Sequence, residues 1–160
     1  MALTVLATFV DPAAGLRVEA TAGSGFSIVM DADDADLPAT AATPREGLLA
    51  ALAGCTAMDV ASILRKKRQR ASGYRVSVVG ETRQDAHPHV FTSIVIEHQV
   101  EGRVEAEALR RSIELSATRY CPLIAMVSAS TTVEHRYRLR VDGAESDQAA
   151  LVLVTGPGGA

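Results

Sequence analysis

Two cysteines are the residues of this 160-residue chain whose types and positions point most directly to chemistry. Cys55 lies within an apolar run at residues 48–58, and Cys121 directly precedes Pro122 after a stretch with helical spacing. A chain of this length buries a core without needing disulfide bonds. The two residues are therefore interpreted as a thiol pair that can react, contributed by separate helices, and not as a structural bridge.

The local sequence favours Cys121 as the nucleophile. A thiol reacts as its thiolate, and a helix N-terminus or a neighbouring cation lowers its pKa from about 8.5. Cys121 precedes Pro122 at a predicted helix start and closely follows Arg119. Cys55 lies in the third turn of an apolar helix, where burial raises a thiol pKa unless a cation approaches from elsewhere. A small buried hydrophobe is the commoner role for such a cysteine taken alone.

Composition indicates one cytoplasmic domain with a sizeable core. The chain is 48% hydrophobic and 22% charged, and its formal net charge of −3 gives no broad attraction to nucleic acid. The basic run at residues 65–70 suits the C-terminus of a helix, where cations complement the helix dipole. The N-terminus lacks the basic region of a secretory signal.

The long apolar window at residues 48–64 predicts the central helix that carries Cys55. It spans 17 residues and contains Asp59, whereas a membrane span needs about 20 mainly apolar residues, so we expect no membrane crossing. Thr43, Pro44 and Glu46 form a capping-box signal at its start, and the helix is predicted to end near residue 70. A helix this apolar is expected to be buried, and one small sheet is too little to cover it, which favours a homodimer.

The remaining pattern predicts an α+β fold with an N-terminal β-meander, the long central helix, a β-hairpin, a second helix, a short third helix and a final strand. The domain is expected to cover residues 1–141, followed by a C-terminal tail at 142–160, within which 151–154 can form an edge strand but whose end is expected to be disordered. The expected strands are 3–10, 15–21, 25–30, 74–84, 90–101 and 131–141, and the later helices are 104–119 and 122–129.

No cofactor or metal is expected. The acidic run at residues 31–36 lacks the glycine and terminal glutamate of a calcium-binding EF-hand loop. The sequence has no CxxC motif, and its four histidines show no ligand spacing, with His87 and His89 in a predicted hairpin loop and His98 and His135 in strand patterns. A dyad of a thiol and a histidine stays open, but no spacing supports it.

Two segments resemble the OsmC/Ohr family of thiol-dependent peroxidases, which includes osmotically inducible protein C and the organic hydroperoxide resistance proteins. They are TPREGLLAALAGCTAMDV at residues 43–60 and YCPL at residues 120–123. The likeness spans roughly residues 5–140, and the sequence of the first segment is closest to an OsmC-like branch of that family. It implies the OsmC-like fold and an intertwined homodimer with two active sites at the interface.

The resemblance reverses the assignment of the two thiols. It implies that Cys55 attacks an organic hydroperoxide and becomes a sulfenic acid, and that Cys121 resolves it to a disulfide. An external dithiol, typically lipoyl-based in this family, then reduces the pair as part of an oxidative stress response. An apolar pocket favouring bulky hydroperoxides is expected around Cys55 from Leu48, Leu52, Met58, Leu123 and Met126.

The cation that activates Cys55 is a further expectation from the resemblance. Family enzymes use an arginine from the N-terminal hairpin, held by a glutamate at the start of the central helix. Arg17 is the only arginine before residue 45, and Glu46 is the corresponding glutamate, although it also serves as a cap. Arg45 and Arg119 are the alternatives to Arg17.

A function from another class stays open beside the peroxidase. A long apolar helix bordered by β-hairpins can line a pocket that holds a small apolar ligand without turnover. The two thiols together with Glu46 favour the enzyme, whereas the register of Arg17, about two positions from the family arginine, favours the binding protein.

Overall fold

The computed structural model describes residues 2–34, 36–157 and 159. The chain forms two compact units, the first ending at Leu48 and the second beginning at Leu49. The boundary lies within the first turns of helix α1 (Pro44–Lys66). The sequence predicts one domain over residues 1–141, whereas the structure divides into these two units.

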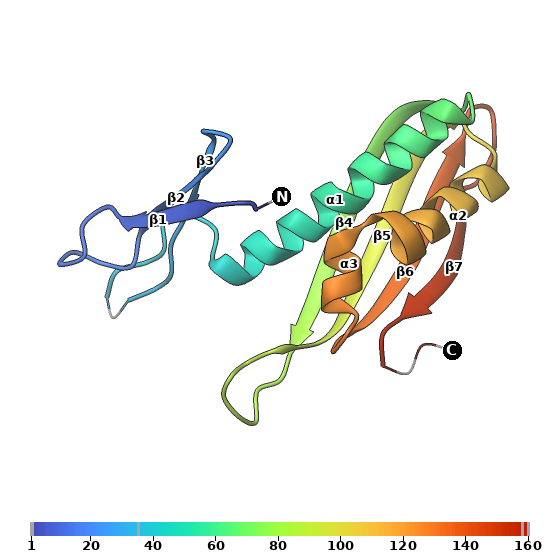
Figure 1. Ribbon diagram of the computed structural model, residues 1–160. Helices are drawn as coiled ribbons and strands as arrows, with labels where there is room; N and C mark the ends of the chain where they lie inside the picture. Colours follow the sequence, from blue (N-terminus) through green and yellow to red (C-terminus); the bar gives the residue numbers. More distant parts are fainter. Residues whose placement is uncertain (1, 35, 158, 160) are drawn as a thin grey trace. The chain divides into compact units, whose positions relative to one another are not determined.

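Unit 1 is a three-stranded antiparallel meander of β1 (Val5–Phe9), β2 (Val18–Ala22) and β3 (Ser27–Met30) (Figure 1). Gly25 closes the turn between β2 and β3 with φ = 88°, a left-handed conformation that glycine adopts without a steric penalty. A loop then leads to α1, and the Asp31 carboxylate organises it by accepting hydrogen bonds from the backbone and hydroxyl of Thr40 and from the backbone N–H of Ala32. The predicted N-terminal meander is confirmed.

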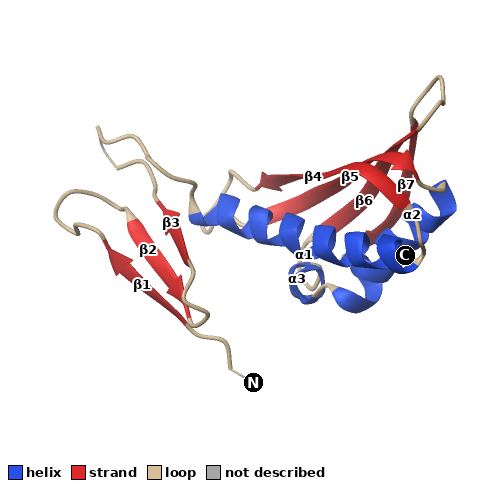
Figure 2. Cartoon of the chain, turned by 90° about the horizontal axis from the view of Figure 1, so that it is seen from above, coloured by secondary structure: helices blue, strands red, loops and turns tan. Residues whose placement is uncertain are grey.

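Unit 2 is a four-stranded sheet in the order β4-β5-β6-β7, with helices on one face (Figure 2). The elements after α1 are β4 (Arg70–Thr82), β5 (Phe91–Arg103), α2 (Ala106–Leu115), the π-helical turn η1 (Ser116–Tyr120), α3 (Pro122–Val127), β6 (Thr132–Val141) and β7 (Gln148–Thr155). The β4–β5 hairpin is antiparallel, and β6 returns parallel to β5 after the crossover through α2, η1 and α3. The predicted α+β class is confirmed.

The segment expected to be a tail contributes a strand to this sheet. Strand β7 pairs antiparallel with β6 along its length, so the edge strand predicted at residues 151–154 is present and longer than expected. Placing the end of the domain at residue 141 therefore cuts off part of the sheet. Gly158 and Ala160, where disorder was expected, lie outside the described residues.

The second predicted helix, at residues 104–119, is also corrected. It ends at Leu115 and continues as the π-helical turn η1, which is closed by the hydrogen bond from the Cys121 backbone N–H to the Ser116 carbonyl at 2.9 Å. The wider π turn changes the direction in which the following residues face. It therefore determines where the Cys121 side chain lies.

Helix α1 is less buried within one chain than expected. By length and composition it could cross a membrane, because an 18-residue window has a mean hydropathy of 1.8, but only 22% of that window is buried. One such helix is weak evidence for a membrane protein, since core helices of soluble proteins have the same composition. The buried residues of α1 are Leu52, Thr56, Val60 and Leu64, one helical turn apart, and they face the sheet.

A layer of polar residues divides the core of unit 2 into two apolar clusters. One cluster includes Val60 and Leu139, and the other includes Leu52 and Ile96. The layer between them, which we call the polar layer, consists of buried side chains from four elements: Thr56, His98, Ser116 and His135.

Candidate active site: a thiol pair beside a carboxylate

The structure brings the two thiols together in unit 2. Cys55 comes from the middle of α1 and Cys121 is the N-cap residue of α3. Their sulfur atoms and a carboxylate oxygen of Asp59 all lie within 4.8 Å of one another, and both cysteines are free. The convergence of the two thiols predicted from the sequence is therefore present, although the sequence interpretation did not include Asp59.

Cys121 is held in place by backbone contacts on both sides. The π turn η1 fixes its backbone, and its sulfur accepts a hydrogen bond from the Ile124 backbone N–H at 3.5 Å. Ile124 itself is fully buried in the cluster that also contains Cys121, so α3 is anchored. Cys55, in contrast, is half-buried on α1. Of the two thiols it is the more accessible.

The electrostatics of the pair contradict the local argument that favours Cys121 as the nucleophile. Burial raises the pKa of the Cys121 thiol, and its hydrogen bond with Cys55 acts in the same direction because it stabilises the protonated thiol. The N–H of Ile124 lowers the pKa, as expected at a helix start, but by less than burial raises it. Cys121 is therefore a thiol at neutral pH, and the helix-start argument overestimates its reactivity.

Asp59 connects the thiol pair to the polar layer. Ser116 Oγ donates to Asp59 Oδ2 at 3.0 Å, and Ser116 Oγ lies 3.0 Å from Thr56 Oγ1. Thr56 Oγ1 lies 3.5 Å from His98 Nε2, and His98 Nδ1 lies 2.7 Å from the Tyr74 hydroxyl. These contacts form a continuous polar chain from the site into the sheet.

His98 and Tyr74 are uncharged members of this chain of polar contacts. Burial, with a smaller contribution from His135, lowers the pKa of His98 to about 3, and burial raises the pKa of Tyr74 above its ordinary value. The sequence interpretation gave His98 no role. The signal for its burial was the alternation of β5, in which Ile94, Ile96, His98 and Val100 share one face.

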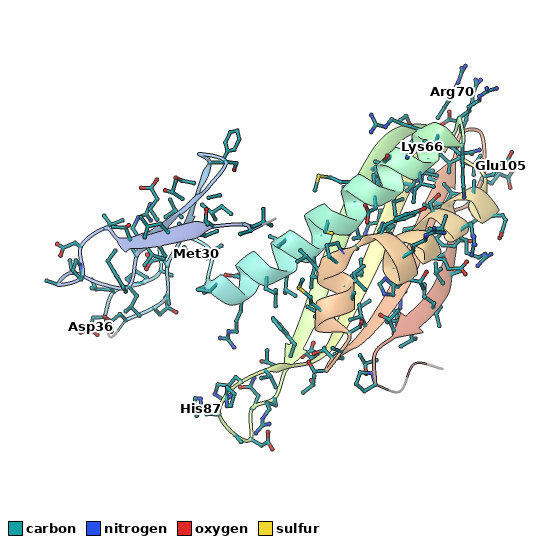
Figure 3. The ribbon with its side chains drawn as sticks, viewed as in Figure 1. Met30, Asp36, Lys66, Arg70, His87 and Glu105 are labelled. Atoms are coloured by element: carbon teal, nitrogen blue, oxygen red, sulfur yellow. The ribbon has the colours of Figure 1, made fainter. Side chains whose placement is uncertain are left out.

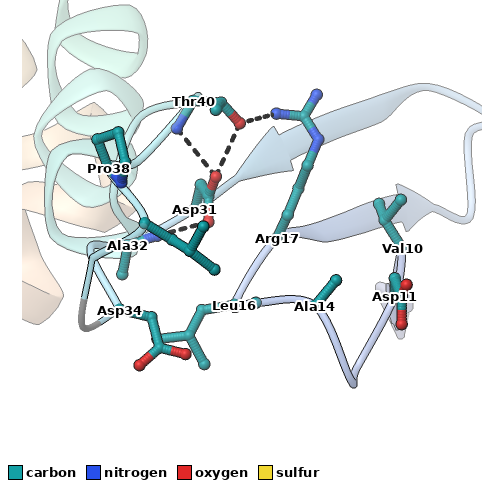
Figure 4. Close-up of a pocket in the computed structure, with 12 residues that line it drawn as sticks. Val10, Asp11, Ala14, Leu16, Arg17, Asp31, Ala32, Asp34, Pro38 and Thr40 are labelled. Carbon is teal, nitrogen blue, oxygen red and sulfur yellow. Dashed lines mark hydrogen bonds between the residues drawn. The ribbon is translucent and has the colours of Figure 1, made fainter.

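Arg17 and Glu46 belong to unit 1, and each is occupied by a local contact. Arg17 Nη1 donates to Thr40 Oγ1 at 2.5 Å, and Thr40 in turn donates to Asp31 (Figure 4). Glu46 accepts from the Thr43 backbone N–H at 2.7 Å and from its hydroxyl, which confirms the capping box. Roles for Arg17 and Glu46 at the thiols stay predictions.

The alternative cations, Arg45 and Arg119, are both exposed. The guanidinium of Arg119 lies over the ring of the adjacent Tyr120, 5.7 Å from its centroid. This stacking directs it along the surface of η1. It provides no support for Arg119 as the activating cation.

A pocket of about 240 Å³ lies next to Asp59 in unit 2. The residues that line it are Asp59, Ser62, Ile63, Lys66, Leu115 and Tyr120. This differs from the apolar pocket predicted from the sequence, because Leu52 is 0% exposed and lies in the core. Met58 and Met126 are largely exposed.

Comparison with known proteins gives a consistent family. Residues 35–136 match the family model described as OsmC-like protein. Protein YhfA of Escherichia coli K12 is 36% identical over 126 residues, covering 78% of this chain and 91% of that protein. A crystal structure of a hypothetical protein from Aquifex aeolicus is 26% identical with a TM-score of 0.76, covering 88% of this chain and 98% of that one.

A more distant structure shares the fold alone. It is an organic hydroperoxide resistance protein from Elizabethkingia anophelis, 14% identical with a TM-score of 0.61, covering 88% of this chain and 95% of that one. On the family match and the relative at 36% identity, the chain belongs to the OsmC-like proteins of the OsmC/Ohr family.

Proposed function

We propose that this protein is a thiol-dependent peroxidase that reduces organic hydroperoxides to alcohols. The observation that carries the proposal is the approach of two free thiols, Cys55 and Cys121, whose sulfurs lie within 4.8 Å of each other on separate elements. A pair at this separation needs only a small movement to form a disulfide. The name of the related hydroperoxide resistance protein gives the substrate class.

In the proposed cycle the Cys55 thiolate attacks the distal oxygen of ROOH. The O–O bond breaks, ROH leaves with one proton, and Cys55 becomes a sulfenic acid. The Cys121 thiol then forms a disulfide with Cys55 and releases water. An external dithiol, which we propose to be lipoyl-based, reduces the disulfide and is itself oxidised.

The difference between the two sulfurs supports these roles. Cys121 is buried and has a raised pKa, so it stays protonated and can donate a hydrogen bond to the sulfur of Cys55. A hydrogen bond to a thiolate stabilises it. Arg17, with Glu46 at the start of α1, is proposed to supply the positive charge for Cys55 as in related enzymes.

We also propose that the active protein is a cytoplasmic homodimer. Large apolar side chains of unit 1 are exposed on its strands and turns, and Met58 of α1 is 70% exposed. Apolar surface of this extent marks an interface. The exposed residues of unit 1 include Val5, Leu6, Phe9, Phe26 and Ile28.

The test is consumption of cumene hydroperoxide by the reduced protein with dihydrolipoamide as reductant. Cys55→Ser should abolish it, whereas Cys121→Ser should reduce one equivalent and stop at a sulfenic acid that a dimedone-type reagent traps. Each methylene buried by the substrate contributes up to about 0.8 kcal/mol, so kcat/KM should be higher for cumene hydroperoxide than for hydrogen peroxide. Wild-type protein with alkylated thiols is the control.

Two results would contradict the proposal. Sulfenic acid trapped at Cys121 in the Cys55→Ser protein would reverse the roles, and no turnover with either peroxide would exclude the enzyme. The second result would favour binding of a small apolar ligand. That alternative has less support, because the partly apolar pocket of unit 1 (Figure 4) measures about 250 Å³, below the ~300–1,000 Å³ typical of ligand sites.

A further inference from the structure

Asp59 is a carboxylate whose position the thiol chemistry leaves unexplained. It is half-buried on α1, one helical turn after Cys55. None of the ion pairs found among residues 2–34, 36–157 and 159 includes it. A negative charge beside a thiol opposes formation of the thiolate. An arrangement with two thiols and one carboxylate is instead the donor set of a cation site.

We propose that the reduced protein binds one Zn²⁺ ion through Cys55 Sγ, Cys121 Sγ and a carboxylate oxygen of Asp59. Thiolate sulfur and carboxylate oxygen are both established zinc ligands, and three protein ligands with an open fourth position is the arrangement of exchangeable, non-structural zinc sites. Sulfur donors favour Zn²⁺ over Mg²⁺ or Ca²⁺, which prefer oxygen. This departs from the sequence expectation of no metal, which rested on linear ligand spacing.

The geometry requires little rearrangement. Zinc–sulfur bonds of about 2.3 Å and zinc–oxygen bonds of about 2.0–2.2 Å in a tetrahedron place the donor atoms roughly 3.4–3.8 Å apart. The three donors already lie within 4.8 Å of one another, so each separation has to shorten by about 1.4 Å at most. Rotation of the half-buried Cys55 and Asp59 side chains is enough for such a change.

The surroundings of the donors resemble the supporting contacts of metal sites. Cys55 and Asp59 lie four residues apart and share one face of α1. Ser116 Oγ donates to Asp59 Oδ2, and the Ile124 backbone N–H donates to Cys121 Sγ. Hydrogen bonds of this kind orient ligands before the metal arrives. The three donors therefore come from two elements, α1 and the start of α3, whose positions do not depend on a metal.

The proposed site depends on the oxidation state of the thiols and not on peroxidase turnover. Binding converts two thiols to thiolates and releases two protons to solvent, with no electron transfer. A disulfide between Cys55 and Cys121 offers no thiolate, so the oxidised protein should not bind the ion. Zinc and hydroperoxide therefore compete for the same sulfurs.

The experiment is an anaerobic titration of the reduced, metal-free protein with Zn²⁺ by calorimetry, and with Co²⁺ to detect the thiolate-to-metal charge-transfer band. It uses the His87→Ala/His89→Ala background. The two imidazoles lie in the loop of the β4–β5 hairpin, where Figure 3 labels His87; their ring centroids are 4.1 Å apart, and they can bind metal on their own. We expect one ion per chain. Cys55→Ser and Cys121→Ser should each weaken the charge-transfer band, because one of the two thiolate ligands is lost.

The decisive variant is Asp59→Asn, which keeps an acceptor for Ser116 and removes the charge. We expect its affinity for Zn²⁺ to fall by at least about 10–100-fold, the loss that follows removal of a residue that only supports a metal ligand. The control is Glu105→Gln, an exposed carboxylate whose removal should leave the affinity unchanged. Circular dichroism and the melting temperature verify that each variant is folded.

Three outcomes would overturn the proposal: equal affinity of Asp59→Asn and the parent protein, an unchanged band in either serine variant, or Zn²⁺ binding by protein oxidised with diamide. Hydroperoxide consumption by the metal-free protein is measured separately. A protein that binds zinc but does not turn over peroxide would refute only the proposed function. A protein that turns over peroxide without binding zinc would refute only this inference.

Discussion

The sheet of unit 1 and the sheet of unit 2 both carry many apolar side chains, but the structure covers them to different extents. In unit 2, alternate residues of β5 are buried under the helices. In unit 1, every residue of β1 is exposed, and Ala20 of β2 is the only buried residue in the three strands β1, β2 and β3. Unit 1 contains only the part of α1 from Pro44 to Leu48, so its sheet has no helical layer of its own.

This difference shows that burial depends on available cover as well as on sequence pattern. Unit 2 folds back on itself through α2, η1 and α3 and completes a core within one chain. Unit 1 presents its apolar residues on one small sheet, which needs a second layer to cover them. We therefore expect unit 2 to provide most of the stability of the folded chain, and unit 1 to provide the contacts between two chains.

The largest expected effect is on the stability of unit 2 in acid. The pKa values of His98 and His135 are lowered by burial to about 3 and about 4. Below pH 6.5 the unfolded chain takes up protons that the folded chain excludes, so stability is complete above pH 6.5 and is lost as pH falls toward these values. Each histidine contributes about 1.4 kcal/mol per pH unit, or about 5 kcal/mol for both between pH 6.5 and 4.5.

Urea unfolding across this pH range measures the effect. His87→Ala, in the exposed hairpin loop, is the control and should not change the slope. Unit 1 should respond only at lower pH, because hydrogen bonds from Thr40 and Thr43 lower the pKa values of Asp31 and Glu46 from 3.8 and 4.5, and the stability that they provide is lost as pH falls below these values. A free energy of unfolding that is constant from pH 6.5 to 4.5 would contradict the burial of neutral histidines.

The next effect concerns the apolar part of the same core. Ile96→Ala should lower the free energy of unfolding by about 2–5 kcal/mol, because Ile96 is 0% exposed and its truncation leaves a cavity. Val79→Ala, on the outer face of β4, is the matched control and should change it by less than about 0.5 kcal/mol. Equal losses in the two variants would mean that the outer face of the sheet is also covered.

The smallest effect tests association through unit 1. Phe26 is 78% exposed, and burying a phenylalanine contributes about 1.5–3 kcal/mol. If unit 1 forms the dimer interface, Phe26→Ser should raise the dimer dissociation constant by about 10–100-fold in sedimentation equilibrium. Val79→Ser should not. A monomeric wild-type protein, or an unchanged dimer dissociation constant in Phe26→Ser, would contradict a dimer interface formed by unit 1.

The features predictable from the sequence are those that local patterns determine. The capping box at Thr43 and Glu46 was found because its residues are three positions apart, and the β4–β5 hairpin because its strands alternate. Strand β7 was underestimated, since its hydrogen bonds to β6 depend on tertiary pairing. The π turn at Ser116 likewise has no periodicity signal.

The candidate site was predictable in part. The two cysteines stood out because they are the only two in the chain, and the resemblance paired them. Asp59 was noted only as a charge against a membrane span, because its place beside both sulfurs depends on how α1 packs against η1. The pKa of Cys121 was misjudged because the helix start is visible in sequence whereas burial is not.

The polar layer of unit 2 also determines the register in which α1 packs against the sheet. Apolar clusters alone would tolerate a shift of α1 along the sheet by one turn, since Leu52, Val60 and Leu64 are interchangeable in kind. Such a shift would place Thr56 against aliphatic side chains, so Ser116 Oγ and His98 Nε2 would lose their contacts with Thr56 Oγ1, at a cost of about 1–3 kcal/mol for each buried group left without a partner. The polar layer thus favours the one alignment of α1 in which Cys55 lies next to Cys121.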